Sequence, residues 1–261
     1  MAEAEELIQL LTNKTGMAAM LAPSFPIVFD YPAIVGKLKR LGFSYVVEVA
    51  VGAKKTNEGV VAYLQKNPQA RLITSPCASF VQAARKKYPY IQKYLVSQID
   101  SPMGATARIV RGKYPGSRPV FIGPCLAKKI EAKQNYPNLD ILVLTFKEMN
   151  QVFDHFKIEE NEQDHQADFD LKEQETRLYP ISGGLTESSK IKNLLADDRI
   201  EVISGWQKCL EALRRFEENK NLRLLDILFC DGGCINGPGI ASGLSLEERR
   251  KKVIAFWKKK E

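Results

Sequence analysis

Short apolar runs alternate with segments of helical periodicity along most of this chain, and this alternation constrains the fold more than any other feature. A short continuous apolar run is typical of a strand buried on both faces, whereas apolar residues spaced three and four apart indicate a helix. We expect strands at residues 17–23, 45–52, 70–76, 118–123, 139–144, 200–205 and 224–230. We expect helices at residues 6–15, 31–42, 56–67, 78–88, 126–134, 145–156, 186–195 and 206–219.

Strands that alternate with helices predict parallel sheets covered by helices. The chain has 261 residues and 44% hydrophobic content, which is enough to bury a large core. The expected fold class is therefore α/β, with two lobes of mainly parallel sheet flanked by helices. In such sheets ligands bind beyond the carboxyl ends of the strands, so we expect functional residues in the loops that follow strands.

A polar, acid-rich segment at residues 154–176 interrupts the alternation and indicates a lobe connection or surface insertion rather than core. We expect a single domain over residues 1–261, with a first lobe at about 15–153 and a second lobe at about 177–245. A basic helix is expected to follow at residues 245–260.

Two capping boxes mark the starts of helices in this scheme. Thr145 with Glu148 and Ser245 with Glu248 have the spacing at which a hydroxyl and a carboxylate satisfy the first backbone amides. The helix after Ser245 holds the main cluster of basic residues. We expect it to pack on the domain as a solvated terminal helix rather than to bind a membrane or an anionic partner. Its expected apolar side consists of Val253, Ile254 and Trp257.

The overall charge excludes several classes of protein. A net charge of +7, from 38 basic and 31 acidic residues, is too small for a nucleic-acid-binding protein unless the lysines cluster. No stretch approaches the roughly 18 apolar residues of a membrane span, and the acidic amino end does not resemble a secretory signal. We therefore expect a cytoplasmic protein with no nucleic-acid partner and no membrane span.

Four of the five cysteines directly follow expected strands. Cys77, Cys125, Cys230 and Cys234 each lie in a loop after an apolar run, where the loops of a parallel sheet converge. Cys209 differs, because it lies within an expected helix and is read as a small buried core residue. An odd number of cysteines in a chain without a secretory signal favours reduced thiols that bind metal or do chemistry over a disulfide framework.

Four thiolates suit either a tetrahedral zinc site or an iron–sulfur cluster. Structural zinc sites usually pair two short knuckles, whereas here two isolated cysteines join one C-x-x-x-C pair. A cluster can gather thiolates from distant loops, and Gly232 and Gly233 allow the backbone to approach it closely. Ordinary buried cysteines would explain any one position, but they explain four strand ends poorly.

Rival cofactors have little support in the sequence. The only two histidines, His155 and His165, lie in or beside the acid-rich segment. No dinucleotide fingerprint and no phosphate-binding P-loop is present. The stretch SGGL at 182–185 begins a helix and has the form of an anion site, but it is weak support on its own.

The cysteine segments TSPCASFV, GPCLAKKIEA and LFCDGGCINGPG resemble the three cysteine motifs in the catalytic domain of iron-only (FeFe) hydrogenases. The segments MLAPSFP, DSPMG and YPISGG also look like family segments around the active site, and the resemblance covers residues 17–245. It implies a 4Fe-4S cluster, joined through a cysteine to a two-iron subcluster with CO and CN ligands, in the cleft between the lobes. It also implies an electron-transfer or signalling protein partner, with dihydrogen and protons as substrates.

The resemblance assigns roles to individual residues. The four strand-end cysteines match the metal ligands, and Cys234 matches the ligand that bridges to the two-iron unit. Lys128 matches the lysine that donates to a cyanide, and with Ser24 it is expected to be catalytic; without the motif it would read as one surface lysine among many. The expected cofactor-binding residues are Ala22, Pro23, Ser24, Pro102, Met103, Lys128, Gly183 and Gly184.

Several positions depart from the family pattern. Pro76 replaces the cysteine that relays protons to the two-iron unit, and Met103 replaces a glutamine. Gly123 and Leu228 each replace a methionine, and Val60 stands where a glutamate of the proton path is expected, although Glu58 is close by. The chain also lacks ferredoxin-like cysteine runs before the domain. These departures look like the divergent, sensory members of the family.

Three functions follow from these observations. The first is a hydrogenase-type oxidoreductase of low turnover, because its proton relay is altered at Pro76. The second is a module that senses hydrogen through the complete cofactor. The third is a protein that holds only the 4Fe-4S cluster and is related to the hydrogenase-like iron–sulfur assembly factors. Lys128 and the Ala22–Ser24 segment favour the two-iron unit, whereas Pro76, Gly123 and Met103 oppose it.

Overall fold

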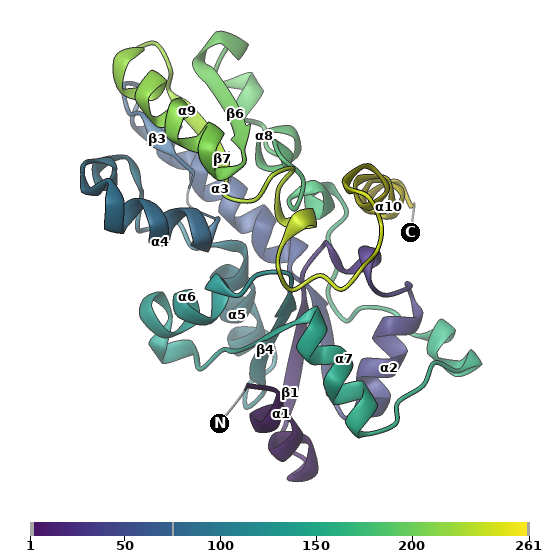
Figure 1. Cartoon of the computed structure of the whole chain (residues 1–261). Coiled ribbons are helices and arrows are strands. Elements are labelled where there is room, and N and C mark those ends of the chain that lie inside the picture. The colour runs from purple at the N-terminus through teal and green to yellow at the C-terminus, as the bar shows by residue number, and fades with distance from the viewer. Residues whose placement is uncertain (1–2, 75, 260–261) are drawn as a thin grey trace.

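Two separate parallel sheets organise the chain in the computed structural model, which describes residues 3–74 and 76–259 (Figure 1). The larger sheet has the strand order β2-β1-β4-β5, and the smaller sheet has the order β3-β7-β6. Strands of the larger sheet are β1 (Met17–Leu21), β2 (Tyr45–Glu48), β4 (Arg118–Gly123) and β5 (Leu142–Thr145). Strands of the smaller sheet are β3 (Leu72–Ile73), β6 (Ile200–Ser204) and β7 (Leu224–Leu228). The predicted fold class is confirmed.

The central strands of both sheets are apolar because helices cover them on both faces. Every residue of β1 is buried, and its register places Ala19 beside Val46 of β2 and Val120 of β4. All five residues of β7 are likewise buried between β3 and β6. Continuous apolar runs of this kind are what a parallel sheet with two covered faces requires.

Ten α-helices surround the sheets within the described residues. They are α1 (Glu3–Thr12), α2 (Ala33–Leu41), α3 (Ala50–Lys66), α4 (Ala78–Lys87), α5 (Pro102–Lys113), α6 (Ala127–Asn135), α7 (Phe146–His155), α8 (Gly184–Ser188), α9 (Trp206–Glu218) and α10 (Leu246–Lys258). Helices α1, α5, α6 and α7 contact strands of the larger sheet, and α9 contacts β6 and β7. Within the described residues, no helix is both long and apolar enough to cross a membrane.

Both predicted capping boxes are confirmed. At the start of α7 the Thr145 hydroxyl accepts from the Glu148 amide at 3.2 Å, and the Glu148 carboxylate accepts from the Thr145 amide at 2.7 Å. Ser245 and Glu248 make the same reciprocal pair at the start of α10. Local sequence therefore sets these two helix starts without help from distant residues.

Helix α5 is absent from the sequence-based scheme, although it begins at the site. Its amino end is fixed by Ser101, whose hydroxyl accepts from the Gly104 amide, and by Pro102 at the first helical position. Small residues dominate its buried face because it packs closely on α3. A Cβ at Gly52 of α3 would lie only 2.2 Å from the Thr106 hydroxyl. Small side chains give a weak helical periodicity, which is why the sequence pattern does not indicate this helix.

The strands do not follow the predicted division into lobes at every point. Strand β3 lies in the amino-terminal half of the chain but pairs with β7, with Leu72 beside Leu224. The smaller sheet therefore takes one strand from before the acid-rich segment and two from after it. The lobe boundaries at 15–153 and 177–245 stay a prediction, and β3 is the segment that crosses between the two sheets.

The acid-rich segment 154–176 is tied to the first lobe by charged pairs rather than by apolar packing alone. The Asp164 carboxylate pairs with Arg40 of α2 at 2.8 Å, and this pair holds the pKa of Asp164 below its ordinary value against the opposing effect of burial. Phe169 of this segment is buried in the larger core. The segment is thus more firmly packed than its polar composition predicts.

Candidate functional site

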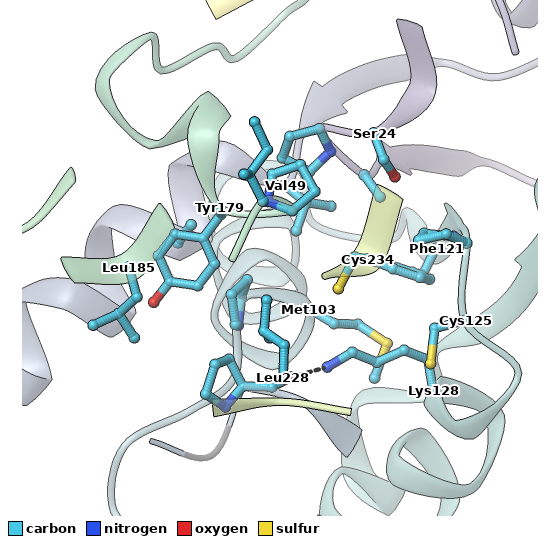
Figure 2. Close-up of a pocket in the computed structure, with 18 of the residues that line it drawn as sticks. Ser24, Val49, Met103, Phe121, Cys125, Lys128, Tyr179, Leu185, Leu228 and Cys234 are labelled. Carbon is cyan, nitrogen blue, oxygen red and sulfur yellow. Dashed lines mark hydrogen bonds between the residues drawn. The ribbon is translucent and has the colours of Figure 1, made fainter. Parts of the chain in front are cut away.

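A cavity of about 70 Å³ lies between the two sheets, at the carboxyl ends of their strands (Figure 2). Loops after β1, β2, β3 and β4 reach it, and β7 contributes side chains from its end. Such a volume has room for about five water molecules. Its lining residues are Ala22, Pro23, Ser24, Val49, Ala53, Pro76, Pro102, Met103, Phe121, Pro124, Cys125, Lys128, Tyr179, Pro180, Ile181, Leu185, Asp226, Leu228 and Cys234.

Two of the four strand-end cysteines, Cys125 and Cys234, line this cavity, and Cys77 and Cys230 lie near them. Cys77 caps α4 after β3, Cys125 follows β4, and Cys230 and Cys234 follow β7. Burial raises the pKa of Cys234 well above its ordinary value, and the Cys77, Cys125 and Cys230 thiols raise it further. Burial, followed by the charges of Cys77 and Cys125, raises the pKa of Cys230 to about 12. The charges of neighbouring thiols thus act on both Cys230 and Cys234, which places these cysteines near Cys77 and Cys125.

The arrangement of these thiols suits a cluster better than one metal ion. Within residues 3–74 and 76–259, no three His, Cys, Asp or Glu side chains are close enough to share a single ion. A tetrahedral zinc site would need its sulfurs about 2.3 Å from one centre. Cys77 is buried and the other three cysteines are half-buried, and neighbouring thiols from separate loops can supply one thiolate to each iron of an iron–sulfur cluster.

Glycines bring the loops of Cys125 and Cys234 together. Gly233 has φ +101°, and a Cβ there would lie 2.5 Å from the Pro180 carbonyl oxygen. A Cβ at Gly237 would lie 2.5 Å from the Pro124 oxygen. Only glycine permits these backbone approaches, so the glycines of 232–239 determine how closely the β4 and β7 loops meet.

Lys128 lies in the cavity wall and is almost fully buried. Its ammonium donates to the Pro76 carbonyl oxygen at 3.0 Å (Figure 2). It also pairs with the Glu131 carboxylate at 2.5 Å. Burial opposes the charged form, but Glu131 outweighs it and the pKa of Lys128 stays above its ordinary value. Lys128 is therefore a charged residue with its countercharge one helical turn away.

Ser24 lies at the opposite side of the cavity and is completely buried. Its hydroxyl has no hydrogen-bond partner among the described residues, although it follows β1 at the start of a helical turn. An unpartnered buried hydroxyl costs free energy, so this position fits a ligand with a polar group. The predicted roles of Ser24 and Lys128 in catalysis stay predictions.

The remaining predicted residues fall on both sides of the cavity. Ala22, Pro23, Pro102 and Met103 line it. Gly183 and Gly184 form the turn between two lining residues, Ile181 and Leu185, and Gly183 has φ +82°. Their predicted part in cofactor binding stays a prediction.

The positions that depart from the family pattern make this part of the cavity apolar. Met103 is fully buried, Leu228 is nearly so, and Pro76 provides only its ring and its carbonyl oxygen. A Cβ at Gly123 would lie 2.6 Å from the Phe121 ring, so that ring occupies the space a larger side chain would need. The residues next to Phe121 in the sequence do not predict that its ring fills this space.

Asp226 and Tyr179 are site residues that sequence reasoning missed. Asp226 accepts from the Thr186 hydroxyl at 2.8 Å and from the Thr186 amide at 3.2 Å, and burial raises its pKa above the ordinary value. The Tyr179 hydroxyl has no hydrogen-bond partner among the described residues. An acid within the otherwise apolar run LLDILF was the available sign for Asp226.

Cys209 is placed as predicted, in the core of the second lobe. It is fully buried on α9, and its thiol donates to the Leu228 carbonyl oxygen at 3.3 Å. Burial raises the pKa of Cys209 to about 12, with a smaller contribution from Cys77. Cys209 thus lies near the four strand-end cysteines, but its thiol is hydrogen-bonded to a backbone carbonyl.

FeFe-hydrogenases are among the solved structures that share this fold. A variant of the FeFe-hydrogenase HydA1 from Chlamydomonas reinhardtii matches with a TM-score of 0.73 and 15% identity, over 99% of this chain and 89% of that one. The structure titled "Stepwise FeFe-hydrogenase H-cluster assembly revealed in the structure of HydA(deltaEFG)" matches with a TM-score of 0.69 and 16% identity, over 99% and 89% of the two chains. At this identity the likeness shows the fold alone.

Curated relatives carry a different description. The probable cytosolic Fe-S cluster assembly factor oxy-4 of Caenorhabditis elegans is 24% identical over 85% of this chain and 60% of its own length. The cytosolic Fe-S cluster assembly factor NAR1 of Encephalitozoon cuniculi is 27% identical over 64% of this chain and 51% of its own. The chain thus spans between half and three fifths of these relatives.

A family match covers most of the chain and agrees with the geometry of the cavity. The family described as iron only hydrogenase large subunit, C-terminal domain, matches residues 15–238. This range includes both sheets and all four neighbouring cysteines. The chain therefore belongs to the family formed by the C-terminal domains of iron-only hydrogenases.

Proposed function

We propose that this chain binds one 4Fe-4S cluster through Cys77, Cys125, Cys230 and Cys234 and works as a cytosolic iron–sulfur cluster assembly factor rather than as a hydrogenase. The observation that carries the proposal is the contrast within the cavity, where Cys125 and Cys234, with Cys77 and Cys230 near them, adjoin a mainly apolar wall. Curated relatives described as cytosolic assembly factors support it.

The apolar wall is poorly suited to moving protons. Hydrogen turnover needs an acid–base group within hydrogen-bond reach of the reacting site, and such groups typically contribute about a hundredfold or more in rate. Pro76 has no ionisable side chain, and Lys128 is engaged by Glu131 and the Pro76 oxygen. A cluster used for assembly needs thiolate ligands and shielding from water, and it does not need a proton relay.

Two hydrogen bonds to cysteine sulfurs and the apolar side chains around them favour a bound cluster. The Phe229 amide donates to the Cys77 sulfur at 3.4 Å, and the Ser79 hydroxyl lies 3.5 Å from the Cys125 sulfur. Such hydrogen bonds to thiolate ligands raise the reduction potential of a cluster. When bound, the cluster would supply one-electron chemistry. The apolar side chains beside the cluster keep water away from it. The partners that would receive the cluster are proteins rather than nucleic acid or a membrane.

Anaerobic reconstitution tests this function directly. The full chain is incubated with iron and sulfide, and iron content and electron paramagnetic resonance are measured. We expect four irons per chain and the signal of a reduced cubane. Stoichiometric zinc without a cubane signal would contradict the proposal. A synthetic two-iron precursor is then added, and we expect no carbonyl or cyanide bands in the infrared.

A second candidate function is slow hydrogen turnover or hydrogen sensing through a two-iron unit beside the cluster. The unpartnered Ser24 hydroxyl and the buried Lys128 favour it, because both can donate to cyanide ligands. Carbonyl and cyanide bands after addition of the precursor would select this candidate. In that case Pro76→Cys should raise hydrogen turnover above Pro76→Ala, which removes the ring without adding a thiol.

A further inference from the structure

Strand β5 forms one edge of the larger sheet and borders a cavity that the proposed function does not use. Only β4 pairs with β5 within the described residues, so the other side of β5 is an open sheet edge. The cavity at this edge has a volume of about 320 Å³, and residues of α1, α6 and β5 line it. Of the residues that the structure describes, no cysteine lines it, so it is separate from the cysteine site.

Val143 of β5 directs its backbone amide and carbonyl away from the sheet. In a parallel pair only one of two opposite residues bonds across, and the direction alternates along each strand. Ile122 of β4 accepts from Ala22 beside β1, so Phe121, which lies opposite Val143, is the residue that faces β5. The Thr145 amide agrees, because it bonds to a side chain after β5 instead of to β4. Val143, two residues earlier, points to the same outer side.

The outward backbone of Val143 is buried and unpaired. Val143 is only 3% exposed and lines the cavity. Within residues 3–74 and 76–259, no residue bonds to its amide or carbonyl on the outer side. Buried amide and carbonyl groups without partners cost free energy, and a strand edge presents them at the spacing of another strand. An extended peptide is the ligand that satisfies both groups at once.

The opposite edge of the same sheet already carries an extended segment. Beside β2, the Asp170 amide donates to the Val46 carbonyl oxygen and the Glu48 amide donates to the Leu171 carbonyl oxygen, each at 2.9 Å. Val47 and Leu171 form a parallel bridge there. The chain thus covers the β2 edge with its own backbone, whereas the β5 edge faces a cavity.

Ion pairs bound the cavity near both ends of β5. Near the amino end, Arg118 pairs with Glu6 at 2.7 Å and with Asp140 at 2.8 Å. Near the carboxyl end, Lys129 of α6 pairs with Glu3 of α1 at 3.0 Å and also with a carboxylate just after β5. Every charged residue that lines the cavity has an opposite charge within 4.0 Å. The cavity therefore suits a short segment that brings no charge of its own.

We propose that this β5 edge groove, defined by Ala132, Tyr136, Ile141 and Val143, binds a short, extended and uncharged segment of a partner protein. The segment adds a fifth strand to the larger sheet and pairs with the backbone of Val143. Ala132 and Tyr136, at the end of α6, offer apolar surface to its side chains. A second copy of this chain does not fit, because α1 and α6 flank β5 and keep another such edge away. This binding needs no cluster and goes beyond the proposed function.

Amide hydrogen exchange of the full chain, followed by NMR, tests the groove. Leu144 is the internal control, because its amide faces β4. In the free chain we expect the Val143 amide to exchange about a hundredfold faster than the Leu144 amide. The probe is a short capped peptide of alternating valine and threonine. At about ten times its Kd, the peptide should slow Val143 exchange about tenfold, since about a tenth of the chain remains unbound, and it should leave Leu144 unchanged.

A matched control peptide has the same side chains but carries N-methyl groups on its amides. It cannot donate to the Val143 carbonyl oxygen, so we expect it to leave the exchange of Val143 unchanged. Equal protection by the two peptides would overturn the proposal, because side chains rather than strand pairing would then account for binding.

Two substitutions at one position separate the backbone bond from the side chain. Val143→Pro removes the outward amide, which β4 does not use, whereas Val143→Ala keeps that amide and also loses side-chain packing. Fluorescence anisotropy of a labelled peptide measures binding. We expect Val143→Pro to raise the Kd about tenfold relative to Val143→Ala. Leu144 exchange shows whether β5 is intact in each variant, and equal Kd values with β5 intact would contradict strand pairing at Val143.

Three results with the unmodified chain would also overturn the proposal. A Val143 amide as protected as Leu144 in the free chain would show that the edge is already bonded. Val143 exchange that stays unchanged with the peptide at about 1 mM, a weak affinity for a specific site, would leave the groove to water alone. Val143 protection that rises with the concentration of the chain, together with dimers in sedimentation, would make a second copy the occupant.

Discussion

The two ends of the cavity between the sheets contrast sharply. At one end lie the cysteines that follow three strands, and the charges of neighbouring thiols raise the pKa of Cys230 and of Cys234 beyond the effect of burial. At the other end, the side chains are mainly apolar. The polar groups there are the buried acid Asp226 and the hydroxyls of Ser24 and Tyr179, which have no hydrogen-bond partner within the described part of the chain. The first end holds the four cysteines that we predict to be the cluster ligands.

The contrast predicts that cluster binding and proton handling are separable in this fold. The positions of the thiols depend on how closely the loops approach one another, and Gly233 and Gly237 permit that approach. Proton handling would depend on single side chains in the wall, and those positions hold Pro76, Met103 and Leu228. Four predictions, from the largest expected effect to the smallest, test this division.

The largest effect is expected at the cysteine end. Cys230→Ser should remove most of the cluster, because a cubane held by three thiolates is labile. Cys209→Ser should leave iron content nearly unchanged, since Cys209 bonds to the Leu228 carbonyl oxygen. Iron analysis and electron paramagnetic resonance after reconstitution measure both. Equal loss in the two variants would mean that Cys209 belongs to the ligand set.

The next effect concerns the ion pair in the wall. Lys128→Met should lower the free energy of unfolding of the apoprotein by about 3 kcal/mol, because it leaves the buried Glu131 carboxylate without its countercharge. The double variant with Glu131→Gln should recover most of this loss. Urea denaturation measures both variants. If the double variant were as unstable as the single one, packing of the lysine stem would be the cause.

Phe121 provides a smaller test of how the apolar end is filled. Gly123→Met should destabilise the chain by about 1–3 kcal/mol, because its Cβ would lie 2.6 Å from the Phe121 ring. Adding Phe121→Leu should relieve the strain. Thermal unfolding of the two variants checks this. An unaffected single variant would show that the ring moves aside readily.

The smallest effect is a pH dependence at Asp226. Its folded pKa is raised by burial, so the protonated form stabilises the fold at pH values below the ordinary pKa of about 3.9. That contribution is lost as the pH rises through the folded pKa. Relative to Asp226→Asn, the unmodified apoprotein should therefore lose up to about 1.4 kcal/mol per pH unit in this window.

Urea unfolding at several pH values measures the difference between the two proteins. Groups that titrate equally in both, including the thiols, cancel in this comparison. A stability difference that stayed constant with pH would show that Asp226 is ionised in the fold, and the polar groups of that end would then have to stabilise a charge.

The sequence alone determined the elements whose causes are local. The mainly apolar runs predicted β1, β4 and β7 because a strand covered on both faces buries nearly all of its side chains. The capping boxes at Thr145 and Ser245 predicted two helix starts, since the groups that satisfy each other lie three residues apart. The cysteine motifs predicted the family because their spacing follows the strand ends.

Only the tertiary structure decided which distant residues meet. Two-residue β3 pairs with β7 across some 150 residues of chain, and no local pattern encodes that choice. The Phe121 ring fills the space beside Gly123, and Trp206 of α9 stands beside Tyr88 after α4. Such contacts depend on how whole sheets and helices pack, because a side chain's neighbours across the core are set by backbone paths far away in sequence.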